Sequence, residues 1–104
     1  MSDTIPCRVV RQVIADILIE RSNTIDDICD TMIEREMNEI GIITEYTSEV
    51  GWTACGTRVL ADEVIDGTMS IEEAVEVLTP DERREAKARC QKWLDKKEEN
   101  NIEK

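Results

Sequence analysis

Residues 4–21 have the sequence TIPCRVVRQVIADILIER, and this stretch decides the fold class. Its apolar residues recur at intervals of three and four, which places them on one face of an α-helix. These residues are Cys7, Val10, Val13, Ile14, Ile17 and Leu18. The same helical spacing dominates the rest of the chain, so the sequence predicts an all-α protein.

Outward from this stretch, Ser22-Asn23-Thr24 interrupts the apolar pattern, and Asn23 or Thr24 is a suitable cap for a second helix at about 24–40. Gly41 follows in the usual position of a left-handed residue that ends a helix. Residues 42–48 have some strand propensity, but the chain offers no second strand to pair with them. We expect a loop or a frayed helix start there.

A third helix is predicted at about 48–66. Its expected apolar face consists of Trp52, Cys55, Gly56, Val59 and Leu60. Glycine inside a helix costs about 1 kcal/mol relative to alanine. The position of Gly56 on this face therefore predicts close approach of a neighbouring helix.

Two helix-start signals follow. Ser70-Ile-Glu-Glu73 is a capping box for a short helix that ends at Leu78, and Thr79-Pro-Asp-Glu82 is a second one. The last helix should reach about residue 98. The sequence thus predicts a compact single-domain bundle of about five short helices over residues 1–98, with a frayed tail at 99–104.

Charge is the most distinctive property of the composition. The 104 residues carry a net charge of −11. Residues 1–78 hold 17 acidic and 5 basic side chains, whereas residues 79–104 hold 7 acidic and 8 basic ones. So acidic a body repels nucleic acid and anionic lipid, and we expect it to bind neither directly. The chain has no apolar run of spanning length and its amino terminus lacks the pattern of a signal peptide, which favours a soluble cytoplasmic protein.

The sequence contains no recognisable arrangement of catalytic residues. The chain has no histidine, which excludes Ser-His and Cys-His nucleophile pairs. The four cysteines, at positions 7, 29, 55 and 90, are spaced as small buried hydrophobes on separate helices, without the close pairs of ordinary zinc sites. We expect reduced thiols, no metal, no cofactor and no enzymatic activity.

One segment, residues 62–73, resembles the twelve-residue calcium loop of the EF-hand family. Asp62, Asp66, Gly67, Ser70 and Glu73 occupy positions 1, 5, 6, 9 and 12 of that pattern, and Met69 occupies position 8. Val64 stands at position 3, where the family has an oxygen ligand. The resemblance implies a calcium-responsive helical module, whereas helix termination and capping explain the same residues without calcium.

Acidic columns supply the candidate binding residues. Asp26, Asp30 and Glu34 recur every four residues, and Glu72 and Glu76 repeat the pattern on the short helix. Like charges at this spacing destabilise a helix by about 0.2–0.5 kcal/mol per pair. They either keep the protein soluble or form a surface for a basic protein. On the second interpretation, the protein inhibits or regulates a nucleic-acid-binding partner by mimicking nucleic acid, as small phage and mobile-element inhibitors do.

Basic residues concentrate in the last helix. The expected basic contact face consists of Arg84, Lys87, Arg89, Lys92 and Lys96. This face either pairs with the acidic body or completes a homodimer through the last helix. A helix-turn-helix over residues 70–94, with Arg83, Arg84 and Lys87 on its DNA-contacting face, is a further alternative. Two acidic residues, Glu36 and Glu63, lie on the expected apolar faces of the second and third predicted helices. Arg21 is the expected ion-pair partner for one of them.

Overall fold

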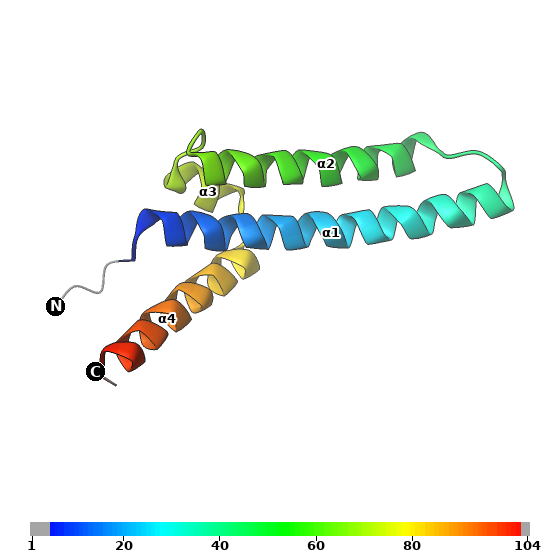
Figure 1. The fold of residues 1–104 in the computed structure, drawn as a ribbon. Coiled ribbons are helices and arrows are strands. Elements are labelled where there is room, and N and C mark those ends of the chain that lie inside the picture. Colours follow the sequence, from blue (N-terminus) through cyan, green and yellow to red (C-terminus); the bar gives the residue numbers. More distant parts are fainter. Residues whose placement is uncertain (1–4, 103–104) are drawn as a thin grey trace.

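The computed structural model describes residues 5–102 and contains four α-helices within that range. They are α1 (Cys7–Glu39), α2 (Glu45–Asp66), α3 (Ile71–Val77) and α4 (Pro80–Ile102). Helices α1 and α2 form a long antiparallel hairpin, α3 folds back beside the end of α2, and α4 runs away from the first half of α1 (Figure 1). The described residues contain no strand, which confirms the all-α class.

The described residues form four helices instead of the expected five, because the first two predicted helices are one continuous helix, α1. Ser22, which was expected to interrupt the helix, is fully buried, and its Oγ donates a hydrogen bond to the carbonyl of Ala54 on α2 at 2.8 Å. The Thr24 hydroxyl donates to the carbonyl of Glu20 one turn earlier at 3.0 Å. Both hydroxyls thus find acceptors while α1 stays continuous, Ser22 on the neighbouring helix and Thr24 on the carbonyl one turn earlier in its own helix.

The predicted helix ends are largely confirmed. Gly41 and Gly67 both have positive φ, +75° and +86°, and each follows a helix. Thr44 caps α2 by accepting a hydrogen bond from the Thr47 amide. The uncertain stretch 42–48 is therefore divided between a short loop and the first turn of α2, which begins at Glu45.

Both predicted caps form, and the second of them is a complete capping box. The Ser70 hydroxyl accepts from the Glu73 amide at 3.2 Å. The Thr79 hydroxyl accepts from the Glu82 amide at 3.2 Å, and the Glu82 carboxylate accepts from the Thr79 amide at 3.0 Å. Helix α4 continues to Ile102, beyond the expected end at 98.

The hydrophobic core lies where the first half of α1 meets the end of α2, α3 and the start of α4. Its buried residues are Ile14, Ala15, Ile17, Leu18, Ala61, Val64, Met69, Ala74 and Leu78. Arg11 closes one edge by donating to the carbonyls of Val64 and Met69 at 2.8 and 2.7 Å. A cation suits this position because the carbonyl end of a helix carries a partial negative charge.

Beyond this core, small residues hold α1 and α2 together over residues 25–60, which we call the distal hairpin. On its buried face α2 contributes Thr47, Ala54 and Thr57 to this region, and Ala61 and Val64 further along the same face belong to the core. The face predicted for burial is wrong, because Trp52 is 75% exposed and a Cβ built on Gly56 meets nothing within 4 Å. The close approach occurs at Gly51, whose added Cβ would lie 3.4 Å from the Cys29 Sγ.

The distal hairpin makes the molecule long. The principal extents are 63, 28 and 21 Å, and the radius of gyration is 18.0 Å. A typical globular domain of this length has a radius of gyration of about 13 Å. Figure 1 shows the reason: the hairpin continues past α3 and α4 to the turn between α1 and α2. None of the helices in the described part of the chain is both long and apolar enough to cross a membrane.

The two glycines of α2 give a test of this helix pairing. We expect Gly56→Ala to stabilise the protein by about 1 kcal/mol, because the site is helical and open. Gly51→Ala should gain less or lose stability, because the new methyl group would press on Cys29. Urea unfolding followed by circular dichroism measures both. A larger gain at Gly51 than at Gly56 would contradict the register.

Candidate functional site

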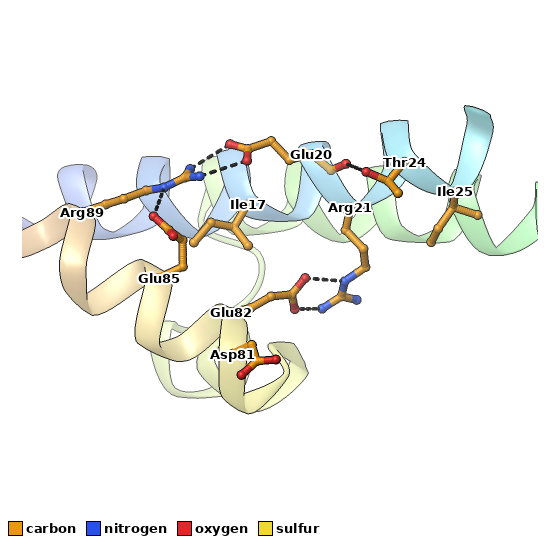
Figure 2. A pocket seen from close by; sticks show the side chains of 9 residues that line it. All are labelled: Ile17, Glu20, Arg21, Thr24, Ile25, Asp81, Glu82, Glu85 and Arg89. Carbon is orange, nitrogen blue, oxygen red and sulfur yellow. Dashed lines mark hydrogen bonds and ion pairs between the residues drawn. The ribbon is translucent and has the colours of Figure 1, made fainter. Parts of the chain in front are cut away.

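An arginine on α4 joins that helix to α1. The Arg89 guanidinium donates two hydrogen bonds to the Glu20 carboxylate, at 2.8 and 2.9 Å, and a third to Glu85 at 2.9 Å (Figure 2). A two-pronged contact of this kind fixes the orientation of both side chains. Part of the basic face of the last helix is therefore used within the molecule.

A second arginine makes a similar joint. Arg21 donates through Nε to Glu82 at 2.8 Å and through Nη2 to the Val77 carbonyl at 3.0 Å, and it forms an ion pair with Glu82 (Figure 2). The prediction that Arg21 pairs with Glu36 or Glu63 is wrong. The reason is that α1 is continuous, which carries Glu36 far along the hairpin from the start of α4.

The electrostatics of these joints disfavour a general-acid role for either carboxylate. Hydrogen bonds from Arg89 lower the pKa of Glu20, and those from Arg21 lower the pKa of Glu82. Carboxylates of lowered pKa stay ionised near neutral pH and are poor general acids. The open cavity beside them, about 480 Å³, has Ile17 and Ile25 in its lining, and we interpret it as the seam of a structural joint.

Glu36 holds the turn of the hairpin. Its carboxylate accepts from the Thr44 amide at 2.7 Å, from the Thr44 hydroxyl at 3.2 Å and from the Thr47 hydroxyl. These bonds, led by the one from the Thr44 amide, lower the pKa of Glu36. An acid at the start of α2 also suits the positive end of that helix. Glu36 therefore binds the first turn of α2 instead of forming the expected ion pair with Arg21.

The first acidic column lies in the distal hairpin. Asp26 is already engaged, because Arg58 on α2 pairs with its carboxylate at 2.7 Å and also reaches Asn23 at 3.3 Å. Asp30 and Glu34 are exposed, and no ion pair between described residues includes either of them. Two acids of the predicted column therefore remain available to a partner.

The second acidic column lies elsewhere. Glu72 and Glu76 are exposed on α3, which packs through Ala74 and Leu78 against the first half of α1. Figure 1 shows α3 near the start of α1, whereas the distal hairpin extends in the opposite direction. The structure does not bring the two predicted columns together into one surface.

The predicted basic face is divided between internal and exposed residues. Arg84 pairs with its neighbour Asp81, and Arg89 with α1. Lys87, Lys92 and Lys96 are exposed, and the ion pairs between described residues include none of them.

The helix-turn-helix alternative loses one of its contact residues. Arg83 donates to the carbonyls of Val75 and Glu76, at 2.9 and 3.2 Å, and so caps the end of α3. Its guanidinium is held against the protein backbone.

The segment that resembles a calcium loop does not form a loop over most of its length. Asp62 and Asp66 lie in the last turns of α2, and Glu73 lies in α3 beside the Ser70 cap. The Asp66 carboxylate accepts from the Thr68 amide at 2.8 Å. Across the described residues, the structure gathers no group of three or more acidic or cysteine side chains that could hold a metal.

The cysteines differ from the prediction of four buried residues on four helices. Only Cys29 is buried, Cys90 is half-buried, and Cys7 and Cys55 are exposed. Cys7 and Cys29 share α1. Partial burial raises the pKa of the Cys90 thiol, which keeps it in the unreactive protonated form.

A shallow groove between α1 and α2 was not foreseen from the sequence. We call it the hairpin groove, and it is lined by Asp26, Cys29, Ile33, Ile43, Thr47, Ser48, Gly51, Trp52 and Cys55. The sequence signal was present in the spacing of Trp52 and Cys55, which share a helical face. The helical spacing predicts burial of that face, whereas the structure places Trp52 and Cys55 at the surface.

Comparison with known proteins finds no matching family model, no matching curated protein and no matching solved structure.

The Arg21–Glu82 joint predicts a pH-dependent stability difference. We expect Glu82→Gln to lose about 1–2 kcal/mol of unfolding free energy at pH 7, as for other charged hydrogen bonds. Because the folded pKa of Glu82 is lowered, this stabilisation is present above the unfolded carboxyl pKa, about 4.3, and is lost as the pH falls through the folded pKa. Urea titrations at pH 7 and pH 3 measure the loss.

The exposed pair Arg84–Asp81 offers a matched control one residue away. Asp81→Asn should change stability by less than about 1 kcal/mol, since exposed pairs contribute little. An equal loss in the two variants, or a Glu82→Gln loss that is as large at pH 3 as at pH 7, would contradict the assignment.

Calcium should have no effect on folding. Because Asp62 and Asp66 are helical, we expect the melting temperature to be unchanged in about 5 mM calcium, a concentration above the dissociation constants of weak EF-hand sites. Differential scanning calorimetry gives the measurement. A calcium-dependent rise that disappears in Glu73→Gln would show that the loop resemblance is functional.

Proposed function

We propose that this chain is a non-enzymatic interaction protein. It binds a protein with a basic surface through the acidic distal hairpin, and it inhibits or regulates that partner by covering the surface. The observation that carries the proposal is the distribution of ion pairs. The arginines at the α1–α4 junction pair with Glu20 and Glu82, and leave Asp30 and Glu34 exposed.

The energetic argument supports an interaction surface. The distal hairpin holds eight acidic and two basic residues, a net charge of −6. Like charges in a column destabilise a helix, and a column that only conferred solubility would gain nothing from stacking. Concentrated acidity does raise the rate at which a basic partner arrives, because the field steers its approach.

The basic groove of a nucleic-acid-binding protein is the partner surface that fits best. Such grooves hold lysine and arginine side chains spaced to contact phosphates, and a rigid acidic helix presents carboxylates to the same side chains. The protein would act as a mimic of nucleic acid without binding nucleic acid. The use of four cysteines as free thiols fits a reducing compartment, and we place the protein in the cytoplasm.

Charge reversal tests the proposal. We expect the tagged protein to capture basic proteins from a lysate of its source cells, and Asp30→Lys/Glu34→Lys to lose them. Both residues are exposed, so the variant should fold normally. Capture at about 50 mM and at about 500 mM salt should differ strongly, because the Debye length falls from about 14 to 4 Å over this range.

The matched control is Glu72→Lys/Glu76→Lys on α3, which reverses the same number of exposed charges outside the distal hairpin. Mass spectrometry of the captured proteins compares the variants. Equal loss in both would show that net charge alone matters. Undiminished capture by the Asp30 and Glu34 variant would refute the proposed surface.

A further inference from the structure

The hairpin groove carries an inference about the shape of the partner. We infer that the groove binds a basic amphipathic helix of the partner protein, with the apolar face of that helix against Ile33, Trp52 and Cys55 and its lysines or arginines beside Asp30 and Glu34. The inference rests on the proposed function, since it specifies which element of a basic partner is recognised.

Small side chains at the contact between α1 and α2 form the floor of the groove. Gly51 brings α2 close to Cys29, and the Cys29 thiol lies 3.6 Å from the Thr47 carbonyl. On either side of this floor, Ile33 is half-buried and Trp52 is 75% exposed. Tryptophan is enriched among the residues that dominate binding energy, and a hydrophobic groove is the surface that receives the apolar face of an amphipathic helix.

The apolar surface continues toward the turn of the hairpin. Exposed large hydrophobic residues there are Met37, Ile40, Ile42 and Ile43. On α1, Met37 follows Ile33 by four residues, so the two lie on one helical face. Ile43 itself lines the groove, so the apolar side chains form a strip that runs from the groove past Ile33 by at least one further turn of α1. At the other end, the Arg58–Asp26 ion pair joins the two helices and closes the strip.

Acidic side chains border this strip on both helices. On α1, Asp30 and Glu34 each lie three residues before an apolar residue of the strip, Ile33 and Met37, and three residues apart on a helix means side by side. On α2, Glu45 and Glu49 are exposed in the first turns, next to Ser48 and Trp52. An apolar strip with acidic borders matches an apolar helix face with basic borders.

Charge decides between a basic helix and a second copy of the chain. Two distal hairpins packed face to face would bring together two charges of −6. Like-charge juxtaposition of this kind costs several kcal/mol in an interface, so self-association is disfavoured. The basic residues of a docked helix would instead offset the repulsion among the carboxylates of the acidic column.

The experiment uses a synthetic peptide of leucine and lysine, about 18 residues long, arranged as an amphipathic helix. A second peptide of identical composition has its leucines spread around the helix. Fluorescence anisotropy of labelled peptide measures binding to the full chain. We expect the amphipathic peptide to bind at least tenfold more tightly than the control peptide. Trp52→Ala, at an exposed position, should weaken that binding about tenfold.

The matched control is Ile28→Ala on α1, an apolar residue 52% exposed and absent from the groove lining, which should leave binding unchanged. Asp30→Lys/Glu34→Lys should also weaken binding and reduce its dependence on salt. Equal binding of the two peptides, together with no effect of Trp52→Ala, would overturn the groove while leaving an acidic binding surface intact.

Two other outcomes separate the remaining possibilities. If Trp52→Ala weakens binding and the charge reversals do not, the acidic surface of the proposed function fails, and with it the basic class of the helix. Sedimentation of the chain without peptide tests self-association. A dimer that Trp52→Ala converts to a monomer would show that a second copy occupies the groove and would overturn the inference.

Discussion

The close approach of α1 and α2 is the constraint on which the rest of the structure depends. Ala54 and Ala61 on α2 are fully buried, as are Ala15 and Ser22 on α1, and a hydrogen bond joins Ser22 to Ala54. Small residues allow two helix backbones to come near each other, which increases dispersion contacts along the whole seam. Once this seam is fixed, the opposite side of α2 must face outward.

The packing of α2 against α1 through small residues explains which side chains are unexpectedly exposed or buried. Trp52 is exposed because it lies away from the seam, and Ser22 is buried because it lies in it. Within residues 5–102 no third helix covers the distal hairpin, so its apolar residues remain at the surface. Clustered exposed apolar side chains are a feature of protein interaction sites. The seam therefore produces both the stability of the hairpin and the surface that we assign to a partner.

The helical class, most helix ends and the caps at Ser70 and Thr79 could be predicted from the sequence, because they depend on local spacing and on residues such as Gly41, Gly67 and Thr79. The continuity of α1 could not, since Ser22 resembles a break until its partner Ala54 is known. The buried face of α2 also could not, because its apolar residues support two different helical faces. Side-chain size favours the face with Trp52, whereas packing favours the face with Ala54.

The candidate site also combines features that the sequence predicts with features that depend on tertiary packing. Asp30 and Glu34 were identifiable from their spacing alone, since an exposed column needs no tertiary partner. The engagement of Asp26 by Arg58 and of Arg89 by Glu20 depends on which helices meet, and that information is absent from local spacing. The hairpin groove depends on the depth that Gly51 creates, so it is visible only in the assembled hairpin.

The direction in which α4 projects gives the molecule an electrical asymmetry. Residues 83–97 of α4 hold seven basic and two acidic side chains, and Figure 1 shows this segment running toward the end opposite the hairpin turn. Residues 61–82, at the same end, add eight acidic side chains and no basic one, so the charges of α4 are largely offset there, whereas the distal hairpin keeps its net charge of −6. The charge is therefore distributed unevenly along the 63 Å axis, with its acidic centre toward the hairpin turn. In the field of a basic surface the chain experiences a torque that turns the hairpin forward before contact, so the orientation of encounter is set at a distance.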